Sequence, residues 1–379
     1  MERKISNMLS RWLDNNTNIF YFWKGRVAFF AILKAMGVKK GDEVIVPGFT
    51  CVVVANAVKY LDATPVYVDI QQETLNPSFE AIKDAITDKT KVIVTQNTFG
   101  LSTDTDKIAA LARDKGVWSV EDCTHGFGGT FKGKANGTWC DASFFSTQWN
   151  KPFSTGIGGF LLVNNPALIN PVKEVMQDLE KPSVKDVFML TMLIRFQQLF
   201  LTTWTYWALR RLYRFLSRMN IVVGSSEGKE ITGNEMPQNY FRKMSKVQMK
   251  VAAKAIKKFD ALFSERKADA IIYTRFLEKN NKYHVKQKLH KDHAFLKYPV
   301  LVKNRSVFEE KARKAKIELG DWFCSPLHPV KENLCQWDFF DEKTPVASKI
   351  SKHVVNLPLG SNATEKVISF LIRNIDDLM

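Results

Sequence analysis

The sequence predicts an α/β fold, with a mostly parallel central sheet in a large N-terminal domain and a smaller α/β domain at the C-terminus. Between residues 24 and 165, short runs rich in β-branched and aromatic residues alternate with segments of helical length, as in consecutive βαβ units. The chain has 379 residues, of which 45% are hydrophobic and 25% charged, so it can fill a large core and form two domains. This composition excludes a disordered or fibrous chain.

The expected strands and helices of the large domain alternate along the chain. Strands are expected at residues 43–47, 64–70, 91–95, 117–121, 142–147 and 159–164. Helices are expected at residues 26–36, 52–61, 78–86 and 105–115. Ligands of such sheets bind beyond the carboxyl ends of the strands, so the residues that follow each strand are the candidates for a site.

The domain boundary is expected near residue 240. A polar stretch with several glycines at 224–238 predicts a loop. A long helix is expected from about residue 244 to 266, and helices and short strands alternate after it. The large domain is therefore expected to span residues 1–240 and the smaller domain residues 241–379.

An apolar and basic helical segment at residues 187–223 is inserted in the large domain. It contains no acidic residue, and Arg195 and Gln197 interrupt its apolar run before the roughly 20 residues that a membrane crossing needs. Its second half carries an apolar stripe and an arginine stripe, formed by Leu209, Leu212, Tyr213 and Leu216 and by Arg210, Arg214 and Arg218. Such a helix either lies on an anionic membrane surface or packs against its own domain or a partner subunit, and both interpretations stay open.

The net charge of +16 is unevenly distributed. Residues 171–258 contain 16 of the 55 Lys and Arg but only 7 of the 39 Asp and Glu, which is more than half of the excess. Nucleic acid, a membrane surface and an anionic substrate are the three partner classes that a basic chain suggests. No recognition helix, zinc finger or aromatic-basic sheet motif is present, so nucleic acid is not an expected partner.

The cysteines and the N-terminus indicate a cytoplasmic protein. Five cysteines occur, an odd number, and no two are spaced as C-x-x-C, which argues against a disulfide framework and against a structural metal site. The first twelve residues contain no uninterrupted apolar run of the kind found in signal peptides. We therefore expect a cytoplasmic location, with association with the inner face of the membrane as an open alternative.

A carboxylate and a lysine follow two of the expected strands. Asp122 ends one strand, and Lys151 lies in a loop rich in Gly, Ser and Thr after another. A lysine attacks a carbonyl only when unprotonated, and a desolvated site lowers its pKa toward that state. In enzymes that use pyridoxal phosphate, such a lysine holds the cofactor as a Schiff base, and a carboxylate keeps the pyridine nitrogen protonated. Spacing alone leaves open that both residues are structural.

Six collinear motifs in this region extend the pattern. They are KGRVA at 24–28, GDEVIVP at 41–47, ATPVYVD at 63–69, Glu121-Asp122 with His125, Phe145-Ser146 five residues before Lys151, and Gly158-Gly159. With these motifs the chain resembles the sugar aminotransferases of the DegT/DnrJ/StrS family, which are fold-type I enzymes dependent on pyridoxal 5'-phosphate. The resemblance covers residues 23–165 and recurs weakly at 326–328 and 357–359.

The resemblance implies roles for four side chains. Lys151 would hold the cofactor and carry protons between the substrate carbon and the cofactor, and Asp122 would pair with the pyridinium nitrogen. His125 matches the family's Gln or His near the ring hydroxyl, with a packed core histidine as the alternative. Ser146 matches the family's phosphate-binding serine. A lysine rather than a histidine at position 151 favours transamination over dehydration.

The phosphate site that the resemblance implies has two further parts. The backbone amides of Gly25 to Val27, at the start of a helix, would bind the phosphate through the helix dipole. Arg26 stands where the family has Thr, and its guanidinium would either bind the phosphate or face a partner subunit. Asn239, in a distorted form of the family's N-Y-R-M segment, would reach the phosphate of the neighbouring subunit. Cys51 replaces the family's aromatic residue near the ring, for which Phe49 is the candidate substitute.

The function implied is amino transfer, from glutamate, to a keto-sugar attached to a nucleotide or to another carrier. The family implies a homodimer whose composite sites are completed by loops of the other subunit. Two alternatives stay open: an aminotransferase acting on a lipid-linked sugar or other amphiphile at the membrane surface, and a non-catalytic homologue that only binds the cofactor.

Overall fold

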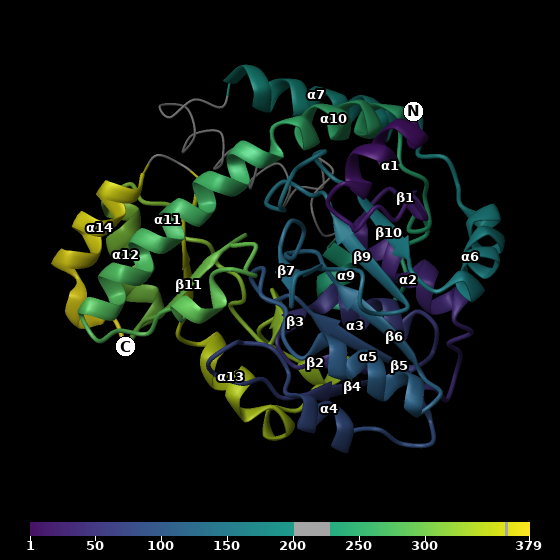
Figure 1. Cartoon of the computed structure of the whole chain (residues 1–379), viewed down its shortest axis with the longest axis horizontal. Coiled ribbons are helices and arrows are strands. Elements are labelled where there is room, and N and C mark those ends of the chain that lie inside the picture. Colours follow the sequence, from purple (N-terminus) through teal and green to yellow (C-terminus); the bar gives the residue numbers. More distant parts are fainter. Residues whose placement is uncertain (201–227, 361–362) are drawn as a thin grey trace.

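The computed structural model describes residues 1–200, 228–360 and 363–379. Its centre is a seven-stranded sheet in the order β1-β10-β9-β6-β5-β2-β4 (Figure 1). Five of these strands run parallel, whereas β10 and β1 pair antiparallel at one edge. The strands are β1 (Ile19–Phe22), β2 (Glu43–Pro47), β4 (Thr64–Val68), β5 (Thr90–Gln96), β6 (Trp118–Asp122), β9 (Ala142–Ser146) and β10 (Gly159–Val163). The predicted mostly parallel sheet is therefore confirmed.

Helices cover both faces of this sheet. Apolar side chains of α2 and α3 pack with one face, and those of α4 and α5 pack with the other. The helices are α2 (Gly25–Ala35), α3 (Val52–Lys59), α4 (Phe79–Asp84), α5 (Thr105–Asp114) and α6 (Ile169–Val175). Each predicted strand and helix of the large domain is present, with ends that differ by a few residues, because helix and strand ends are the parts that periodicity defines least well.

The C-terminal part forms its own core. Apolar residues from Ala270 to Leu378 make one cluster, which is separate from the clusters around the large sheet. Its elements are α11 (Phe259–Lys279), β11 (Tyr298–Leu301), α12 (Arg305–Lys314), α13 (Pro345–Ser351), β13 (Val354–Leu357) and α14 (Thr364–Arg373). The short strand β12 (Leu327–His328) pairs in parallel with β3 (Thr50–Cys51), and an apolar cluster that includes Phe49, Phe99, Phe323 and Ile350 also joins the C-terminal part to the large domain.

The predicted helix at 244–266 is instead two helices. α10 (Lys246–Lys257) ends at Lys258, which is the C-cap of α10 and the N-cap of α11, and α11 starts directly after it. α10 packs on α1 (Glu2–Ser10) and shares a core cluster with it, whereas the C-terminal cluster begins at Ala270. The boundary at 240/241 stays a prediction, and α10 packs with the large domain.

The predicted loop at 224–238 contains a helix. α9 (Gly228–Thr232) lies within it, because Glu230 and Ile231 are drawn into the interior beside α2 and α3. Of the insertion at 187–223, the described part belongs to α7 (Val184–Phe200), and the two stripes of its second half lie outside the described residues. Among the described residues, no helix is long and apolar enough to cross a membrane.

The start of α2 depends on contact between two glycine backbones. A Cβ atom at Gly159 would lie 2.2 Å from Gly25 Cα and 2.4 Å from Gly25 N. A Cβ atom at Gly25 would lie 2.9 Å from both the Phe145 carbonyl oxygen and Ser146 Cβ. Only glycine therefore lets the first turn of α2 lie against β9 and β10.

We predict that Gly159→Ala lowers the free energy of unfolding by about 1–3 kcal/mol, because the added methyl group overpacks this contact. It should also weaken the binding of pyridoxal phosphate by displacing the start of α2 from Ser146. Urea unfolding and cofactor titration measure the two effects. The control is Gly37→Ala at the other end of α2, where φ is +76° and nothing lies within 4 Å of an added Cβ. It should cost about 1–2 kcal/mol without changing cofactor affinity, and equal affinities of both variants would contradict the prediction.

Candidate active site

A cavity of about 240 Å³ lies where the start of α2, the carboxyl ends of β6 and β9 and the loop before β12 meet. This is the edge of the sheet at which ligands of open α/β folds bind. Its walls include residues of both parts of the chain: Gly25, Arg26, Cys51, Asp122, Ser146, Lys151, Trp322 and His328. The structure thus brings together Lys151, Asp122, Ser146 and the helix start that the sequence singled out.

Lys151 has the properties of a reactive amine. Its side chain is buried, and Nζ lies 4.3 Å from the centroid of the Trp322 ring. Burial lowers the pKa of Lys151 from its ordinary 10.5 to about 8, against the opposing effect of the Asp122 carboxylate. With this pKa, about one amine in ten is unprotonated at pH 7.

Asp122 faces the cavity from the last position of β6. Burial raises the pKa of its carboxyl group, while a hydrogen bond from the Thr124 amide at 2.9 Å and the nearby Lys151 ammonium oppose the change. Its neighbour Glu121 points to the other face of the sheet and accepts hydrogen bonds from Asn97 and the Gly137 amide. The two adjacent acids therefore have different roles. Asp122 is available to a ligand, whereas Glu121 stabilises the fold through its hydrogen bonds.

His125 lies behind the cavity wall. Its Nδ1 accepts the Phe99 amide at 3.3 Å, and its ring contacts Trp322 edge to face with centroids 5.1 Å apart. Burial lowers the pKa of His125 well below its ordinary value, with smaller contributions from Lys151 and Lys297. The ring is therefore neutral, and since Nδ1 accepts, its proton is on Nε2.

Ser146 and the first turn of α2 form the cradle expected for a phosphate. α2 begins beside Ser146 through the glycine contact described above, and it has no side-chain cap at its N-terminus. The amide of Val27 donates to the Lys24 carbonyl at 3.2 Å, and Val27 does not line the cavity. Of the three amides expected to bind the phosphate, those of Gly25 and Arg26 belong to residues that face the cavity.

Arg26 forms an ion pair within the chain. Its Nη1 lies 2.7 Å from Oε2 of Glu230 on α9, and both side chains are almost completely buried. Asn56 donates to the Glu230 carbonyl at 2.8 Å and so fixes α9 over α3. The sequence missed Glu230 because it lies in a stretch predicted to be a loop, and a buried arginine is the signal that should have prompted a search for its carboxylate.

Trp322 and His328 are two aromatic cavity residues to which the sequence assigned no role. Their rings stack with centroids 4.8 Å apart, and His328 Nδ1 accepts the Cys324 amide at 3.3 Å. Burial lowers the pKa of His328 to about 4. The only sequence signal for this wall is the weak family likeness at 326–328, since a tryptophan in an irregular loop carries no periodicity.

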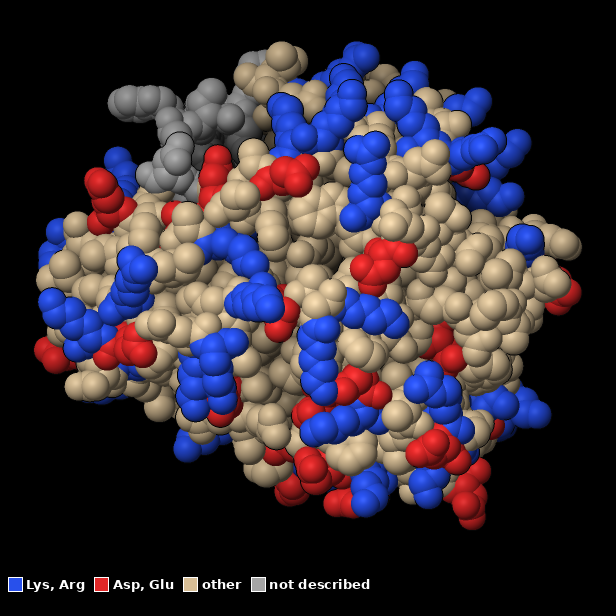
Figure 2. All heavy atoms as spheres, viewed as in Figure 1, with Lys and Arg blue, Asp and Glu red and all other residues tan. Residues whose placement is uncertain are grey.

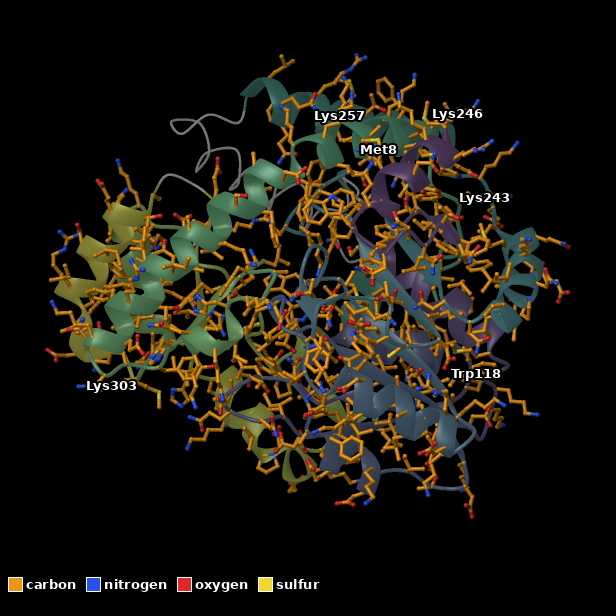
Figure 3. All side chains as sticks on the ribbon, viewed as in Figure 1. Met8, Trp118, Lys243, Lys246, Lys257 and Lys303 are labelled. Atoms are coloured by element: carbon orange, nitrogen blue, oxygen red, sulfur yellow. The ribbon has the colours of Figure 1, made fainter. Side chains whose placement is uncertain are left out.

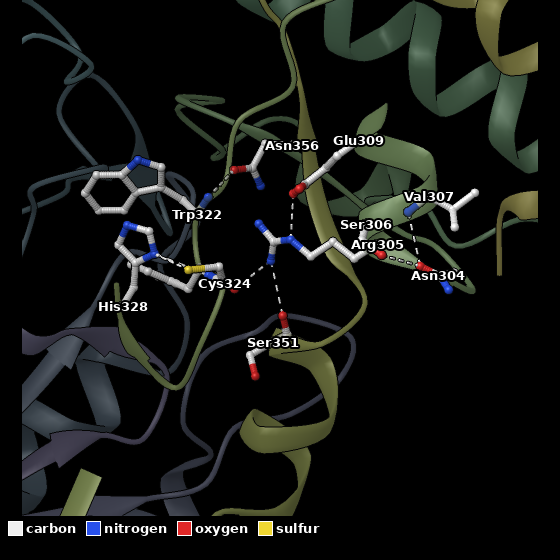
Figure 4. Close-up of polar contacts among 11 residues, drawn as sticks. Asn304, Arg305, Ser306, Val307, Glu309, Trp322, Cys324, His328, Ser351 and Asn356 are labelled. Atoms are coloured by element: carbon white, nitrogen blue, oxygen red, sulfur yellow. Dashed lines mark hydrogen bonds and ion pairs between the residues drawn. The ribbon is translucent and has the colours of Figure 1, made fainter. Parts of the chain in front are cut away.

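The loop that carries Trp322 is held by two side chains of the C-terminal part (Figure 4). Asn356 Oδ1 accepts the Trp322 amide at 3.2 Å. Arg305 Nη1 donates to the Phe323 carbonyl at 3.4 Å and to the Ser351 carbonyl at 3.2 Å. The position of the Trp322 ring over Lys151 therefore depends on the fold of the C-terminal part.

The structure also places three further positions from the sequence analysis, and Phe49 departs from its expected role. Asn239 is exposed in the turn before Tyr240 and does not line the cavity, so its role toward a second subunit stays a prediction. Cys51 does line the cavity at the position where an aromatic was expected. Phe49 is buried against Phe99 and Phe323, because the turn after β2 points it into the core, so it does not replace that aromatic.

A family model matches most of the chain. The model of the DegT/DnrJ/EryC1/StrS aminotransferase family matches residues 21–186 and 210–375. The chain belongs to this family. Membership confirms the resemblance found in the sequence, the fold type and the pyridoxal phosphate cofactor that the resemblance implies.

Curated relatives match a limited part of the chain. GDP-perosamine synthase of Escherichia coli O157:H7 is 42% identical over 144 residues, which are 38% of this chain and 40% of that protein. The UDP-2-acetamido-2-deoxy-3-oxo-D-glucuronate aminotransferase of Pseudomonas aeruginosa is 37% identical over 155 residues, 40% of this chain and 42% of that protein. The match thus spans about two fifths of either relative.

Solved structures share the whole fold at low identity. An aminotransferase from Psychrobacter cryohalolentis superimposes with a TM-score of 0.75 at 20% identity, covering 99% of this chain and 91% of that one. The putative sugar aminotransferase Spr1654 from Streptococcus pneumoniae, in its PMP form, gives a TM-score of 0.74 at 20% identity and covers 98% and 92%. These likenesses support the two-part arrangement around the cavity.

The site residues fit pyridoxal phosphate. A buried lysine of lowered pKa, a buried carboxylate and a serine beside an uncapped helix start are the donors that its aldehyde, ring nitrogen and phosphate require. The glycine at the helix start lets the first turn of α2 lie directly against Ser146, where any other side chain would clash.

We predict that Lys151→Met stabilises the cofactor-free protein at pH 7 by about 1–3 kcal/mol, because a pKa lowered by burial means that the folded state disfavours the ammonium. The loss of stability caused by the buried Lys151 ammonium is complete below pH 8. It disappears between pH 8 and 10.5, because in this range the amine is unprotonated in the folded protein and still protonated in the unfolded chain. Urea unfolding at pH 7 and at pH 10 measures it. The exposed Lys83→Met should change nothing, and a destabilised Lys151→Met would contradict the assignment.

We predict that Glu230→Met destabilises the protein by about 3–5 kcal/mol, because it removes a carboxylate from a buried guanidinium. The double variant Arg26→Met with Glu230→Met should recover part of this loss, since the buried guanidinium is then gone while Lys24, 3.9 Å from the same Oε2, still loses the Glu230 carboxylate. Thermal and urea unfolding of the two single variants and the double variant test the coupling. Additive effects in the double variant would show that the pair does not interact energetically.

Proposed function

We propose that the protein is a pyridoxal-phosphate-dependent aminotransferase that moves an amino group from glutamate to a keto-sugar attached to a nucleotide or another anionic carrier. The observation that carries the proposal is the buried Lys151 amine, with a pKa of about 8, in one cavity with the Asp122 carboxylate and the Ser146 cradle. The printed names of two relatives, a GDP-perosamine synthase and a UDP-sugar aminotransferase, support a nucleotide-linked sugar.

The cofactor, when bound, supplies an electron sink for the bond that breaks at the substrate carbon. The residues of the chain do the rest. Lys151 holds the cofactor and exchanges a proton with the substrate carbon, for which an amine of pKa near 8 is suited. Asp122 would keep a proton on the ring nitrogen, and the neutral His125 would support the Trp322 ring from behind the cavity wall.

The phosphate is bound by Ser146 and by the Gly25 and Arg26 amides, where the helix dipole favours an anion. The Arg26 side chain acts through its pairing with Glu230, which fixes the first turn of α2 to α9. We further propose a homodimer in which Asn239 of one subunit reaches the phosphate site of the other, in line with its exposed position.

Two other functions remain candidates. An amphiphilic or lipid-linked sugar as the substrate is favoured by the apolar outer face of α7. A non-catalytic cofactor-binding homologue is disfavoured by Lys151, because a buried lysine that lowers the stability of the empty protein has no structural benefit.

We predict that the purified protein, loaded with pyridoxal phosphate, has a visible absorbance band of the lysine-bound cofactor. Lys151→Ala should lack this band because the covalent link needs the amine. The spectrum after removal of free cofactor is the measurement, with the exposed Lys83→Ala as the control. A band that survives Lys151→Ala would refute the assignment.

Addition of glutamate should bleach the band and release one equivalent of 2-oxoglutarate for each cofactor. Subsequent addition of a nucleotide-linked keto-sugar should restore it. A band that no amino acid bleaches would favour the non-catalytic homologue, whereas bleaching without recovery by any soluble nucleotide sugar would favour the amphiphilic substrate.

A further inference from the structure

The outer face of α7 is apolar. Val184, Phe188, Met192 and Leu199 recur at spacings of four, four and seven residues, which places them on one side of the helix. Their exposed fractions are 88%, 61%, 48% and 72%. The opposite side is also apolar, and its Leu190 and Ile194 are buried beneath the helix. α7 is therefore apolar on both sides, whereas a helix at a protein surface normally turns polar residues outward.

A row of lysines lies beside this apolar face. Lys246, Lys250, Lys254 and Lys257 are all exposed on α10, and they recur at spacings of four, four and three residues on one side of it. α10 contains no acidic residue. Figure 3 labels Lys246 and Lys257, the two ends of this row, and Figure 2 shows basic side chains gathered along the same edge of the molecule. We call α7's exposed apolar residues and this row the α7/α10 surface.

The two helices are fixed to one another. Val187 of α7 and Val247 and Val251 of α10 pack in the same apolar cluster. Asp186, the acidic residue of α7, is bound by Arg242 at 2.6 Å and so does not neutralise the lysine row. Among the residues that the structure describes, the surface therefore presents apolar side chains and lysines without an acidic partner side by side.

We propose that the α7/α10 surface docks on an anionic lipid bilayer. Lysines near the surface are attracted by anionic headgroups, and apolar side chains enter the boundary between headgroups and acyl chains. A second copy of the chain fits less well, because a twofold interface over this surface would bring one lysine row toward the other. An anionic bilayer supplies both the negative charge that attracts the lysine row and the apolar phase that the exposed side chains of α7 can enter.

The docking surface adjoins the active site. Leu190 and Ile194 of α7 pack on Trp149 and Ile157, which flank Lys151 in the same loop. A Cβ atom at Gly156 would lie 2.8 Å from Leu190 Cδ1, so helix and loop are in direct contact. Docking would hold the Lys151 loop close to the membrane, which suits a substrate carried on a lipid. This last step rests on the amino transfer of the proposed function and on its candidate lipid-linked substrate, whereas the docking itself does not.

The test is flotation of the cofactor-loaded protein with vesicles of phosphatidylcholine alone or mixed with phosphatidylglycerol. We expect binding to the anionic vesicles, with at least a tenfold fall in the partition coefficient when all four lysines of the row are changed to Gln, since lysines near the surface are attracted by anionic headgroups. The matched control changes Lys279, Lys303, Lys349 and Lys352 to Gln, which removes equal charge from the C-terminal part. The control should bind like the wild type.

A second pair of variants tests the apolar residues. Phe188→Ser with Met192→Ser should abolish the part of the binding that survives high salt, whereas Val307→Ser with Ile372→Ser, equally exposed elsewhere, should not. The proposal is overturned if the wild type fails to bind anionic vesicles at low salt. It is also overturned if the variant of the lysine row binds like its lysine control, or if the Phe188→Ser/Met192→Ser variant binds like its apolar control. A wild type that stays off vesicles and a Phe188→Ser/Met192→Ser variant that is smaller by light scattering would instead make this surface an interface between copies. None of these readouts needs catalysis, so they stand apart from failure of the proposed function.

Discussion

The site depends on the contact between the backbones of Gly25 and Gly159. Because neither residue has a Cβ, the first turn of α2 lies directly on the β9–β10 pair, and its amide groups open toward Ser146. The same strand pair leads into and out of the loop that carries Lys151. One packing constraint thus sets the distance between the first turn of α2 and the reactive amine of Lys151, which lie far apart in the chain.

Several ionisable side chains are buried around this contact, and the protein stabilises each of them in a different way. The Arg26 guanidinium is neutralised by Glu230, which makes it a structural link between α2 and α9. Lys151 is compensated only in part by Asp122, and its pKa falls as a result. His125 and His328 stay neutral because burial disfavours their charged forms. Lys151, the reactive amine, is therefore a buried group whose positive charge is compensated only in part by its neighbours.

Most of the fold and the centre of the site were predictable from the sequence. Alternating apolar runs reflect a period that local sterics dictate, so the strands that end at Asp122 and precede Lys151 were found nearly in place. Glu230 and Trp322 were not found, because they reach the cavity through tertiary contacts from segments without periodicity. The break at Lys258 was missed for a related reason: apolar residues continue across it, and Phe259 at the start of α11 packs in the same cluster as α1 and α10.

The lysine row of α10 is an unusual arrangement on energetic grounds. Like charges four residues apart destabilise a helix by a few tenths of a kcal/mol for each pair, and α12 of this protein shows the ordinary solution, with Arg305 paired to Glu309 and Lys314 to Glu310. α10 has no such pairs. It is held instead by the Ser245–Gln248 capping box and by Gln248, which donates to the carbonyls of Trp23 and Ile157. These bonds tie the first turn of α10 to the Lys151 loop, so the helix that carries the repelling row is anchored at the active site, and any surface that binds the row acts on the position of that loop.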